Sequence, residues 1–531
     1  MSVKNISFKS TNYFSSLICD YLDKKPELSQ FYNRFPNLDN FKAQIEEKSL
    51  SVRAQSRNIL VETLKKQYKN SDVSESTLQN IEALKQSNTF TITTGHQLNL
   101  FTGPLYFLYK IISVINLSNE LKQKYSESNF VPVYWMATED HDFEEINYFN
   151  FKGKKVQWNR TSSGAVGELS NNGLDEVFEL FSTALGNGKN ADLLKELFEK
   201  SYLNHDNLAE ATRFLANQLF KNYGLVIIDA NDTDLKRLFI PFVEEELTSQ
   251  TSFKEVSKTN EILSKSYSIQ VNPREINLFY IKEDLRERIV FEDGVYKVNN
   301  TNISWSKSEI QKVLLEHPER FSPNVIMRPL YQEVILPNLC YVGGGGEIAY
   351  WFQLKQYFEK VNVPFPMLLL RNSALIQSEN QQKKLEKLNI SNEDIFLKQD
   401  ELIKKKVKEL SEIEIDFSNQ KVHLKEQFKN MYVLAEETDK SFLGAVKSQE
   451  VKQLKGLENL EKRLLKAQKI KLADHVSRIT ELQNELFPKQ ILQERNTNFS
   501  EFYLEYGTQL IPKLIKNLEP LKGEFTILTM S

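Results

Sequence analysis

One stretch near position 100 limits the possible folds most strongly. Phe90–Thr94 (FTITT) is a β-branched run that ends at Gly95, and residues 130–138 (FVPVYWMAT) form a second apolar run. The residues between them, from Pro104 to Tyr125, have the periodicity of a helix, and proline suits a first helical turn. A strand, a glycine-bearing turn, a helix and a strand make a βαβ unit, which requires a parallel sheet with a right-handed crossover. The sequence therefore predicts an α/β fold.

Further apolar runs extend this core. The strand candidates are GLVIID (224–229), NVIMRPL (324–330), LCYVGGGG (339–346) and PFPMLLL (364–370). Two stretches, at about 150–205 and 265–320, have turn-rich or mixed strand character and are interpreted as insertions. Residues 1–85 have a helical pattern with Pro-Asn and Ser breaks. We therefore predict a core domain over residues 1–375 that carries two insertions.

The composition changes after Arg371. Residues 376–486 contain almost no proline or glycine and are rich in Lys, Glu, Leu and Gln, with apolar residues spaced three and four apart, such as Leu457, Leu460 and Leu464. This pattern is typical of coiled coils. LSEIEIDFSNQ (410–420) breaks the period, so we predict an antiparallel helical hairpin. Residues 487–531 are predicted to return to the core, with EFTILTM as a possible edge strand.

The bulk properties limit the partners and the compartment. The 531-residue chain has a net charge of −3, which gives no broad basic field and predicts no nucleic-acid partner. Two cysteines, Cys19 and Cys340, suit a reducing compartment. The first residues lack a secretory apolar region, and no apolar run is long enough to span a membrane. We expect a cytoplasmic protein without a membrane partner.

The turn TTGHQLNLFTGP (93–104) follows the first predicted strand. In doubly wound folds, ligands bind at the carboxyl ends of strands, near helix N-termini. Gly95 and Gly103 allow a ligand to approach the backbone, while His96, Gln97 and Thr102 offer hydrogen bonds. The segment is neither a GxGxxG motif nor a Walker A loop, so an ordinary β–α turn stays the alternative.

The turn ATEDHDFEE (137–145) follows the second strand and concentrates five carboxylates around His141. Three interpretations compete: a metal site, an acid/base or ammonium-binding site, and a solvated turn. In an extended chain the side chains of Asp140, His141 and Asp142 alternate between faces, so we predict no metal site here. Histidine titrates near neutral pH and is the natural proton carrier. Glu144 and Glu145 are expected to begin a helix or to face solvent.

Two later stretches complete the candidate site. Arg328, in RPLYQEVILPN, is a candidate for bidentate binding of carboxylate or phosphate, with a surface ion pair as the alternative. The four glycines at 343–346 suggest either close passage of a ligand or a tight loop. Glu347 follows them at a helix start, where negative charge is favourable in any case. Cys340 lies in an apolar strand and is interpreted as packing rather than as a nucleophile.

These motifs together resemble one family. TTGHQLNLFTGPLYFLYK, VPVYWMATEDHDFEEIN, FSPNVIMRPLYQEVILPNLCYVGGGGEIAYW and LQERNTNFSEFY are similar to the bacillithiol biosynthesis protein BshC, across essentially the whole chain and in the same order. The resemblance implies a Rossmann-like core with two connecting-peptide insertions and a coiled-coil hairpin that forms a homodimer. It also implies ligation of L-cysteine to the amine of glucosaminyl-malate, which yields bacillithiol.

With this resemblance, each candidate residue is given a predicted role. Asp140, His141 and His96 are predicted to be catalytic, and ATP or ADP is expected as the nucleotide, with no metal. A synthetase-like signature would place a histidine at Thr93, and no Lys-Met-Ser-Lys-Ser loop is visible. The alternatives are a non-catalytic nucleotide-binding scaffold and a metal-dependent hydrolase. The predicted substrate- or nucleotide-binding residues are Gly95, Gln97, Thr102, Gly103, Lys110, Glu139, Arg328, Gln332, Gly343, Gly344, Gly346 and Glu347.

Overall fold

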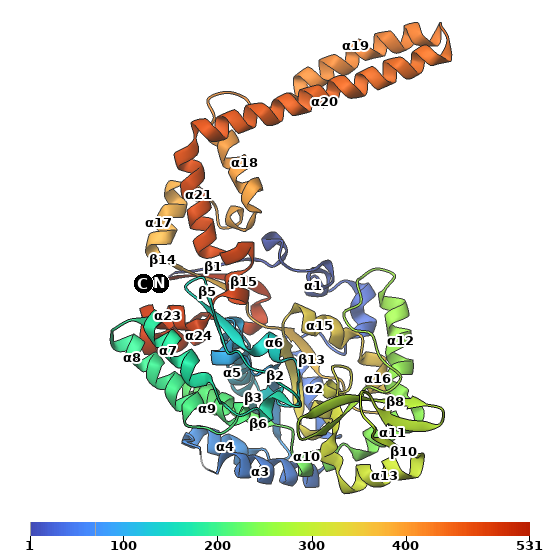
Figure 1. Cartoon of the computed structure of the whole chain (residues 1–531), viewed down its shortest axis with the longest axis vertical. Coiled ribbons are helices and arrows are strands. Elements are labelled where there is room, and N and C mark those ends of the chain that lie inside the picture. The colour runs from blue at the N-terminus through green and yellow to red at the C-terminus, as the bar shows by residue number, and fades with distance from the viewer. Residues whose placement is uncertain (1, 70) are drawn as a thin grey trace.

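A five-stranded parallel sheet forms the centre of the molecule (Figure 1). The computed structural model describes residues 2–69 and 71–531. The sheet has the order β13-β12-β2-β3-β6, and its strands are β2 (Thr89–His96), β3 (Asn129–Met136), β6 (Val226–Asp229), β12 (Asn338–Gly343) and β13 (Met367–Leu370). The chain builds the sheet outward from β2 in one direction and then returns to add β12 and β13 on the other side. The direction in which strands are added to the sheet therefore reverses between β2 and β12. Ligands of open α/β sheets bind at this position.

The central strands are apolar because helices and loops cover the sheet. All eight residues of β2 are buried, as expected for a strand of a covered parallel sheet. Helix α5 contacts both β2 and β3, which confirms the predicted βαβ unit. The helices up to this point are α1 (Ser16–Leu22), α2 (Asn40–Ser49), α3 (Ala54–Tyr68), α4 (Glu75–Ala83) and α5 (Tyr106–Lys124).

The first predicted insertion contains helices and a small hairpin. Its apolar side chains, including Phe149 and Phe181, pack against Phe101 in the turn after β2. This packing joins the insertion to the main hydrophobic core. The elements from here to the second insertion are α6 (Phe143–Ile146), β4 (Tyr148–Phe151), β5 (Lys154–Gln157), α7 (Leu174–Leu185), α8 (Lys189–Phe198), α9 (Leu208–Phe220), α10 (Thr233–Arg237), α11 (Ile240–Ser249) and α12 (Thr251–Leu263).

The second predicted insertion forms an antiparallel sheet with the order β10-β9-β8-β7-β11. The prediction of a strand at residues 324–330 is wrong. This run forms turns and the start of helix α14, and Pro329 lies in the first turn of that helix, where its missing N–H does no harm. The elements are β7 (Leu278–Lys282), β8 (Leu285–Glu292), β9 (Val295–Val298), β10 (Ser304–Trp305), α13 (Lys307–Glu316), β11 (Phe321–Pro323), α14 (Arg328–Ile335), α15 (Gly345–Phe352) and α16 (Lys355–Lys360).

Both ends of the chain meet in a third sheet with the order β1-β15-β14 (Figure 1). Strand β1 (Ser2–Ser7) corrects the helical prediction for the first residues. Strand β15 (Glu524–Met530) lies at the centre of this sheet, not at an edge, because β1 pairs on one side and β14 (Ala374–Ser378) on the other. The C-terminal helices are α22 (Gln493–Asn496), α23 (Phe499–Tyr506) and α24 (Leu510–Asn517).

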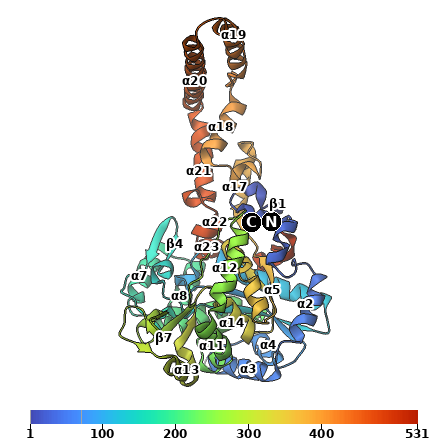
Figure 2. The same cartoon turned by 90° about the vertical axis from the view of Figure 1, so that its right-hand side faces the viewer.

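A helical arm projects from the globular part (Figures 1 and 2). Helices α19 and α20 pack as an antiparallel pair joined at residues 437–439, so the predicted break at 410–420 separates α18 from α19 and is not the hairpin turn. None of the helices in the described ranges is long and apolar enough to cross a membrane. The arm consists of α17 (Glu379–Lys387), α18 (Gln399–Leu410), α19 (Ser418–Glu436), α20 (Lys440–Lys471) and α21 (Ala473–Leu486).

Candidate active site

A cavity of about 850 Å³ lies at the point where the strand order reverses. The carboxyl ends of β2 and β3 and the turn that begins α15 form one part of its wall. The antiparallel sheet of the second insertion supplies another part through Phe279, Arg286 and Arg288. In open α/β sheets, ligands bind at this position, beyond the carboxyl ends of the strands.

Most of the predicted site residues line this cavity, but four do not. Those that line it are Gly95, His96, Gln97, Lys110, Glu139, Asp140, His141, Arg328, Gly344, Gly346 and Glu347. Thr102 and Gly103 instead lie in the turn that Asn498 fixes, through hydrogen bonds from its amide to the carbonyls of Phe101 and Gly103. Gln332 and Gly343 are buried and lie outside the lining.

The buried Lys110 and the partly exposed Glu347 form an ion pair in the wall of the cavity. The Lys110 Nζ lies 2.6 Å from Glu347 Oε2 and also donates to the carbonyl of Gly95. The Tyr341 hydroxyl and the Gly344 N–H both donate to the Glu347 carboxylate. Burial alone would raise the pKa of Glu347, but Lys110 and these hydrogen bonds outweigh it and lower that pKa. Lys110 therefore neutralises Glu347 and is less available for a substrate carboxylate than the sequence suggested.

Arg328 begins α14 and lies beside this ion pair. Its guanidinium donates to Gln332 Oε1 at 3.2 Å and to the Tyr350 hydroxyl at 3.1 Å. It also lies 5.7 Å from the ring centroid of Tyr341. Burial would lower the pKa of Arg328, but the two tyrosines and Glu347 raise it, so the side chain stays a cation. It also lies close to the turn at Gly95, where an added Cβ would be 3.8 Å from its Nη1.

The acidic turn lies across the cavity, and its side chains have different roles. Strand β3 ends at Met136, and the chain then turns, with the Asp140 N–H bonded to the Ala137 carbonyl and the Phe143 N–H to the His141 carbonyl. Glu139 pairs with the buried Lys236. Asp140 accepts a hydrogen bond from Gln97 Nε2 at 3.0 Å. Although burial raises the pKa of Asp140, its contacts with His141 and Gln97 and the charge of Arg286 hold it below the usual value. Asp140 is therefore ionised, which suits an ammonium ligand better than a base.

His141 is held by an arginine that the sequence did not reveal. The Arg286 Nη1 atom lies 2.6 Å from His141 Nδ1. Because a guanidinium can only donate, Nδ1 is the acceptor. A neutral His141 therefore carries its proton on Nε2, and it can accept another at Nδ1 only when Arg286 moves away. Glu145 lies in the first turn of α6 and is exposed, as expected, and it also accepts a hydrogen bond from Gln97 and lines the cavity.

Asp140, His141 and Asp142 do not have the extended geometry that was expected to keep their side chains apart. One ligand atom from each of Asp140, His141 and Asp142 lies within 4.8 Å of the others, because the chain turns where an extended strand was assumed. Exposed acidic groups often approach one another in this way without an ion, and the Arg286 guanidinium already occupies the His141 Nδ1 atom. The cluster by itself does not indicate a metal.

His96 is buried at the end of β2 against the aromatic ring of Tyr106. Burial, followed by the charges of Lys110 and Arg371, lowers the pKa of His96 well below its usual range. The ring is therefore neutral at physiological pH, and it cannot act there as a charged acid. Its predicted catalytic role has less support than a role in shaping the cavity wall.

Apart from Arg328, the arginines of the cavity were not predicted from the sequence. Arg286 and Arg288 are spaced two apart in β8, so they face the same side of the sheet, a signal that was present in LRERIVFE. Arg371 follows β13 and forms a buried ion pair with Glu494 at 2.7 Å. No local motif marks it, because its partner lies in the C-terminal segment. The arginines among the lining residues are Arg274, Arg286, Arg288, Arg328, Arg371 and Arg495.

Comparison with known proteins identifies the family. A model described as "Bacillithiol biosynthesis BshC, N-terminal Rossmann-like domain" matches residues 1–372. A second model, "Bacillithiol biosynthesis BshC, C-terminal coiled-coil domain", matches residues 374–530. The chain belongs to the BshC family.

Relatives of this family match the chain over most or nearly all of its length. The protein named "Putative cysteine ligase BshC" from Flavobacterium johnsoniae is 63% identical over 525 residues, which cover 99% of both chains. The protein of the same name from Christiangramia forsetii is 62% identical over 534 residues, covering 100% of this chain and 99% of the relative. One from Bacillus cereus is 31% identical over 394 residues, or 70% of each chain. The resemblance found from the motifs and the Rossmann-like and coiled-coil fold class are thus confirmed.

Proposed function

We propose that this BshC-family chain ligates the carboxyl group of L-cysteine to the amine of glucosaminyl-malate and so produces bacillithiol. The charge distribution in the cavity carries this proposal, because six arginines lie in the same pocket as the carboxylates of the acidic turn. A malate group brings two carboxylates, which suit arginine. An amine, protonated before reaction, suits the ionised Asp140. The names of the relatives support ligase chemistry.

Within this proposal, the residues bind and orient the two reactants. Arg328 and the arginines of β8 hold carboxylates or phosphates, and Asp140 holds the ammonium group. The amine must lose its proton before it attacks, and His141 accepts that proton once Arg286 turns toward a bound anion. ATP or ADP fits the arginine-rich wall, since phosphate oxygens accept bidentate guanidinium bonds. ATP would supply the activation that amide formation from a free carboxylate requires.

Removing the charge of Asp140 or the imidazole of His141 tests these roles. We expect Asp140→Asn and His141→Gln, each in a strain that lacks the gene, to lower cellular bacillithiol by roughly 100-fold or more, because the first removes the charge that holds the ammonium group and the second removes the proton acceptor. Glucosaminyl-malate should accumulate, and thiol profiling measures both compounds. Asp175→Asn, on the exposed surface of α7, is the control. Normal bacillithiol in both site variants would remove these residues from the mechanism.

The chain could instead be a non-catalytic scaffold for other biosynthetic enzymes or a metal-dependent hydrolase. Purified protein incubated with glucosaminyl-malate, L-cysteine and ATP separates the first alternative from the ligase, because product formed by the isolated chain contradicts a scaffold role. Elemental analysis together with a chelator separates the second, because ligation by metal-free protein contradicts it.

The arm supports the proposal of a homodimer. Helices α19 and α20 bury only the small cluster of Phe428, Ala435 and Val446 between them. Apolar side chains of this size rarely stay uncovered in such number on one element. The exposed large apolar residues of these two helices are Val422, Met431, Val433, Leu434, Phe442, Leu443, Val451, Leu460 and Ile470.

Charged substitutions on the arm test the dimer. We expect the double variant Leu434→Lys, Val451→Lys to be monomeric by size-exclusion chromatography with light scattering, because burying two lysines in an apolar interface is unfavourable. Both native side chains are about 60% exposed in the single chain, at 61% and 60%. Leu180→Lys, at an exposed leucine of α7, should leave the dimer intact. A wild-type protein that is monomeric at micromolar concentration would contradict the proposal.

A further inference from the structure

A buried ion pair lies behind the cavity, outside its lining. The Lys48 Nζ of α2 lies 3.0 Å from Glu333 Oε2 of α14, and the two side chains are 1% and 0% exposed. Lys48 also donates to the backbone carbonyl of Glu333. Moving two charges out of water costs several kcal/mol per ion, so such a pair is weak evidence for stability alone. A role in fixing a particular geometry would explain its presence.

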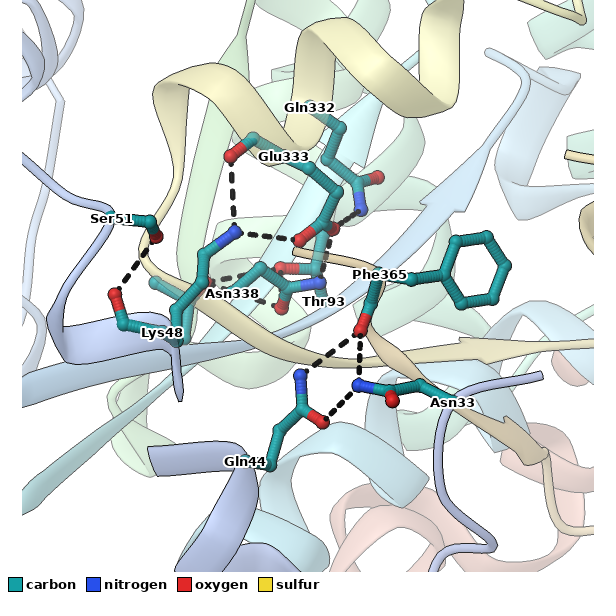
Figure 3. Close-up of polar contacts among 10 residues, drawn as sticks. Asn33, Gln44, Lys48, Ser51, Thr93, Gln332, Glu333, Asn338 and Phe365 are labelled. Atoms are coloured by element: carbon teal, nitrogen blue, oxygen red, sulfur yellow. Dashed lines mark hydrogen bonds and ion pairs between the residues drawn. The ribbon is translucent and has the colours of Figure 1, made fainter. Parts of the chain in front are cut away.

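Hydrogen bonds lead from this ion pair to the cavity, as Figure 3 shows for the part around Glu333. Glu333 Oε1 accepts from Asn338 Nδ2 at 2.6 Å and from Gln332 Nε2 at 3.0 Å. Asn338 in turn accepts from the Thr93 hydroxyl of β2. At the other end, Gln332 Oε1 accepts from Arg328 Nη1. The path therefore runs from Lys48 through Glu333 and Gln332 to Arg328.

The side chains on either side of Gln332, Arg328 and Glu333, allow only one orientation of its amide. Arginine can only donate, so the amide oxygen must face Arg328 and the NH₂ group must face an acceptor. An ionised Glu333 is such an acceptor and cannot donate. Burial raises the pKa of Glu333, and the charge of Lys48 opposes that rise. Lys48 thus favours the ionised acceptor that sets the direction of the amide.

We propose that Gln332, Glu333 and Lys48 are positioning residues that fix the Arg328 guanidinium for the carboxylate of the substrate. This inference rests on the proposed function, in which Arg328 binds a carboxylate of glucosaminyl-malate. It gives helix α2, near the N-terminus of the chain, a part in substrate binding, although Lys48 does not line the cavity. It also explains why a polar Gln332 is fully buried in α14.

The structure offers a matched pair of glutamines for the experiment. Gln332 and Gln44 are both 0% exposed and both use their amide groups in hydrogen bonds. Gln44 donates to the carbonyl of Phe365 and accepts from Asn33 (Figure 3). It also accepts from Arg34, and none of these contacts involves Arg328. Gln332→Met and Gln44→Met therefore remove similar buried hydrogen bonds, but only the first loosens Arg328.

Calorimetric titration of the full-length protein with glucosaminyl-malate measures the effect. We expect Gln332→Met to weaken the affinity about 10-fold, the equivalent of one lost charge-assisted hydrogen bond. Gln44→Met should bind like the wild type. Gln332→Asn, which keeps the amide but is too short to reach both partners, replaces Gln332→Met if that protein does not fold.

A double-mutant cycle with Arg328→Met decides whether Gln332 acts through Arg328. If it does, Gln332→Met weakens binding in the wild type and has no further effect in the Arg328→Met protein. Equal effects in both backgrounds, or no effect in either, overturn the inference while the proposed function stands. If the wild type does not bind glucosaminyl-malate, the proposed function fails, and the inference fails with it.

Discussion

Replacing Lys48 by methionine should lower the free energy of unfolding by about 3–5 kcal/mol, because it leaves the fully buried Glu333 without its cation. The hydrogen bonds from Asn338 and Gln332 to Glu333 remain, but they do not neutralise its charge. Unfolding in urea, followed by circular dichroism, measures the loss.

Two further variants define the cause of that loss. Lys66→Met removes an ion pair with Asp234 that is largely exposed, so it should change the urea midpoint very little. The double variant Lys48→Met, Glu333→Met should recover much of the lost stability, since apolar side chains can replace a buried pair. A stability loss in Lys48→Met no larger than that in Lys66→Met would contradict the assignment of a buried, coupled pair.

Replacing Arg328 by methionine should reduce cellular bacillithiol by roughly 100-fold or more, with accumulation of glucosaminyl-malate. Two charge-assisted hydrogen bonds to a carboxylate contribute about 3–6 kcal/mol, and each 1.4 kcal/mol is a factor of ten in binding. Arg328→Lys should not restore the product, because an ammonium group lacks the planar fork of donors. Thiol profiling of a complemented deletion strain is the measurement.

The control for this prediction is an arginine outside the cavity. Arg237, at the end of α10, is exposed, and Arg237→Met should leave the bacillithiol level unchanged. A thermal melt of purified Arg328→Met shows whether the variant is folded. Bacillithiol at the wild-type level in cells with Arg328→Met would remove this residue from substrate binding and would also deprive the Gln332 inference of its basis.

Local patterns failed where one run of residues fits two structures. The run from Val325 to Leu330 is apolar apart from Arg328, and mostly apolar runs of this length do not distinguish a buried strand from the start of a helix. Pro329 fits the first turn of a helix better than the middle of a sheet, because proline has no N–H to donate to a neighbouring strand. EFTILTM was recognised as a strand, but its central position depends on β1, which pairs from the other end of the chain.

The sequence by itself determined the features that depend on neighbouring residues. The strands β2 and β3, the helix between them and the helical arm follow from periodicity and from where glycine and proline occur, and both act over a few residues. Only the tertiary structure placed β12 beside β2, gathered Arg286 and Arg371 around the cavity, and paired Lys48 with Glu333, 285 positions away. The physical reason is that burial and charge pairing are set by the partner in space, and no local pattern identifies a partner so distant in the chain.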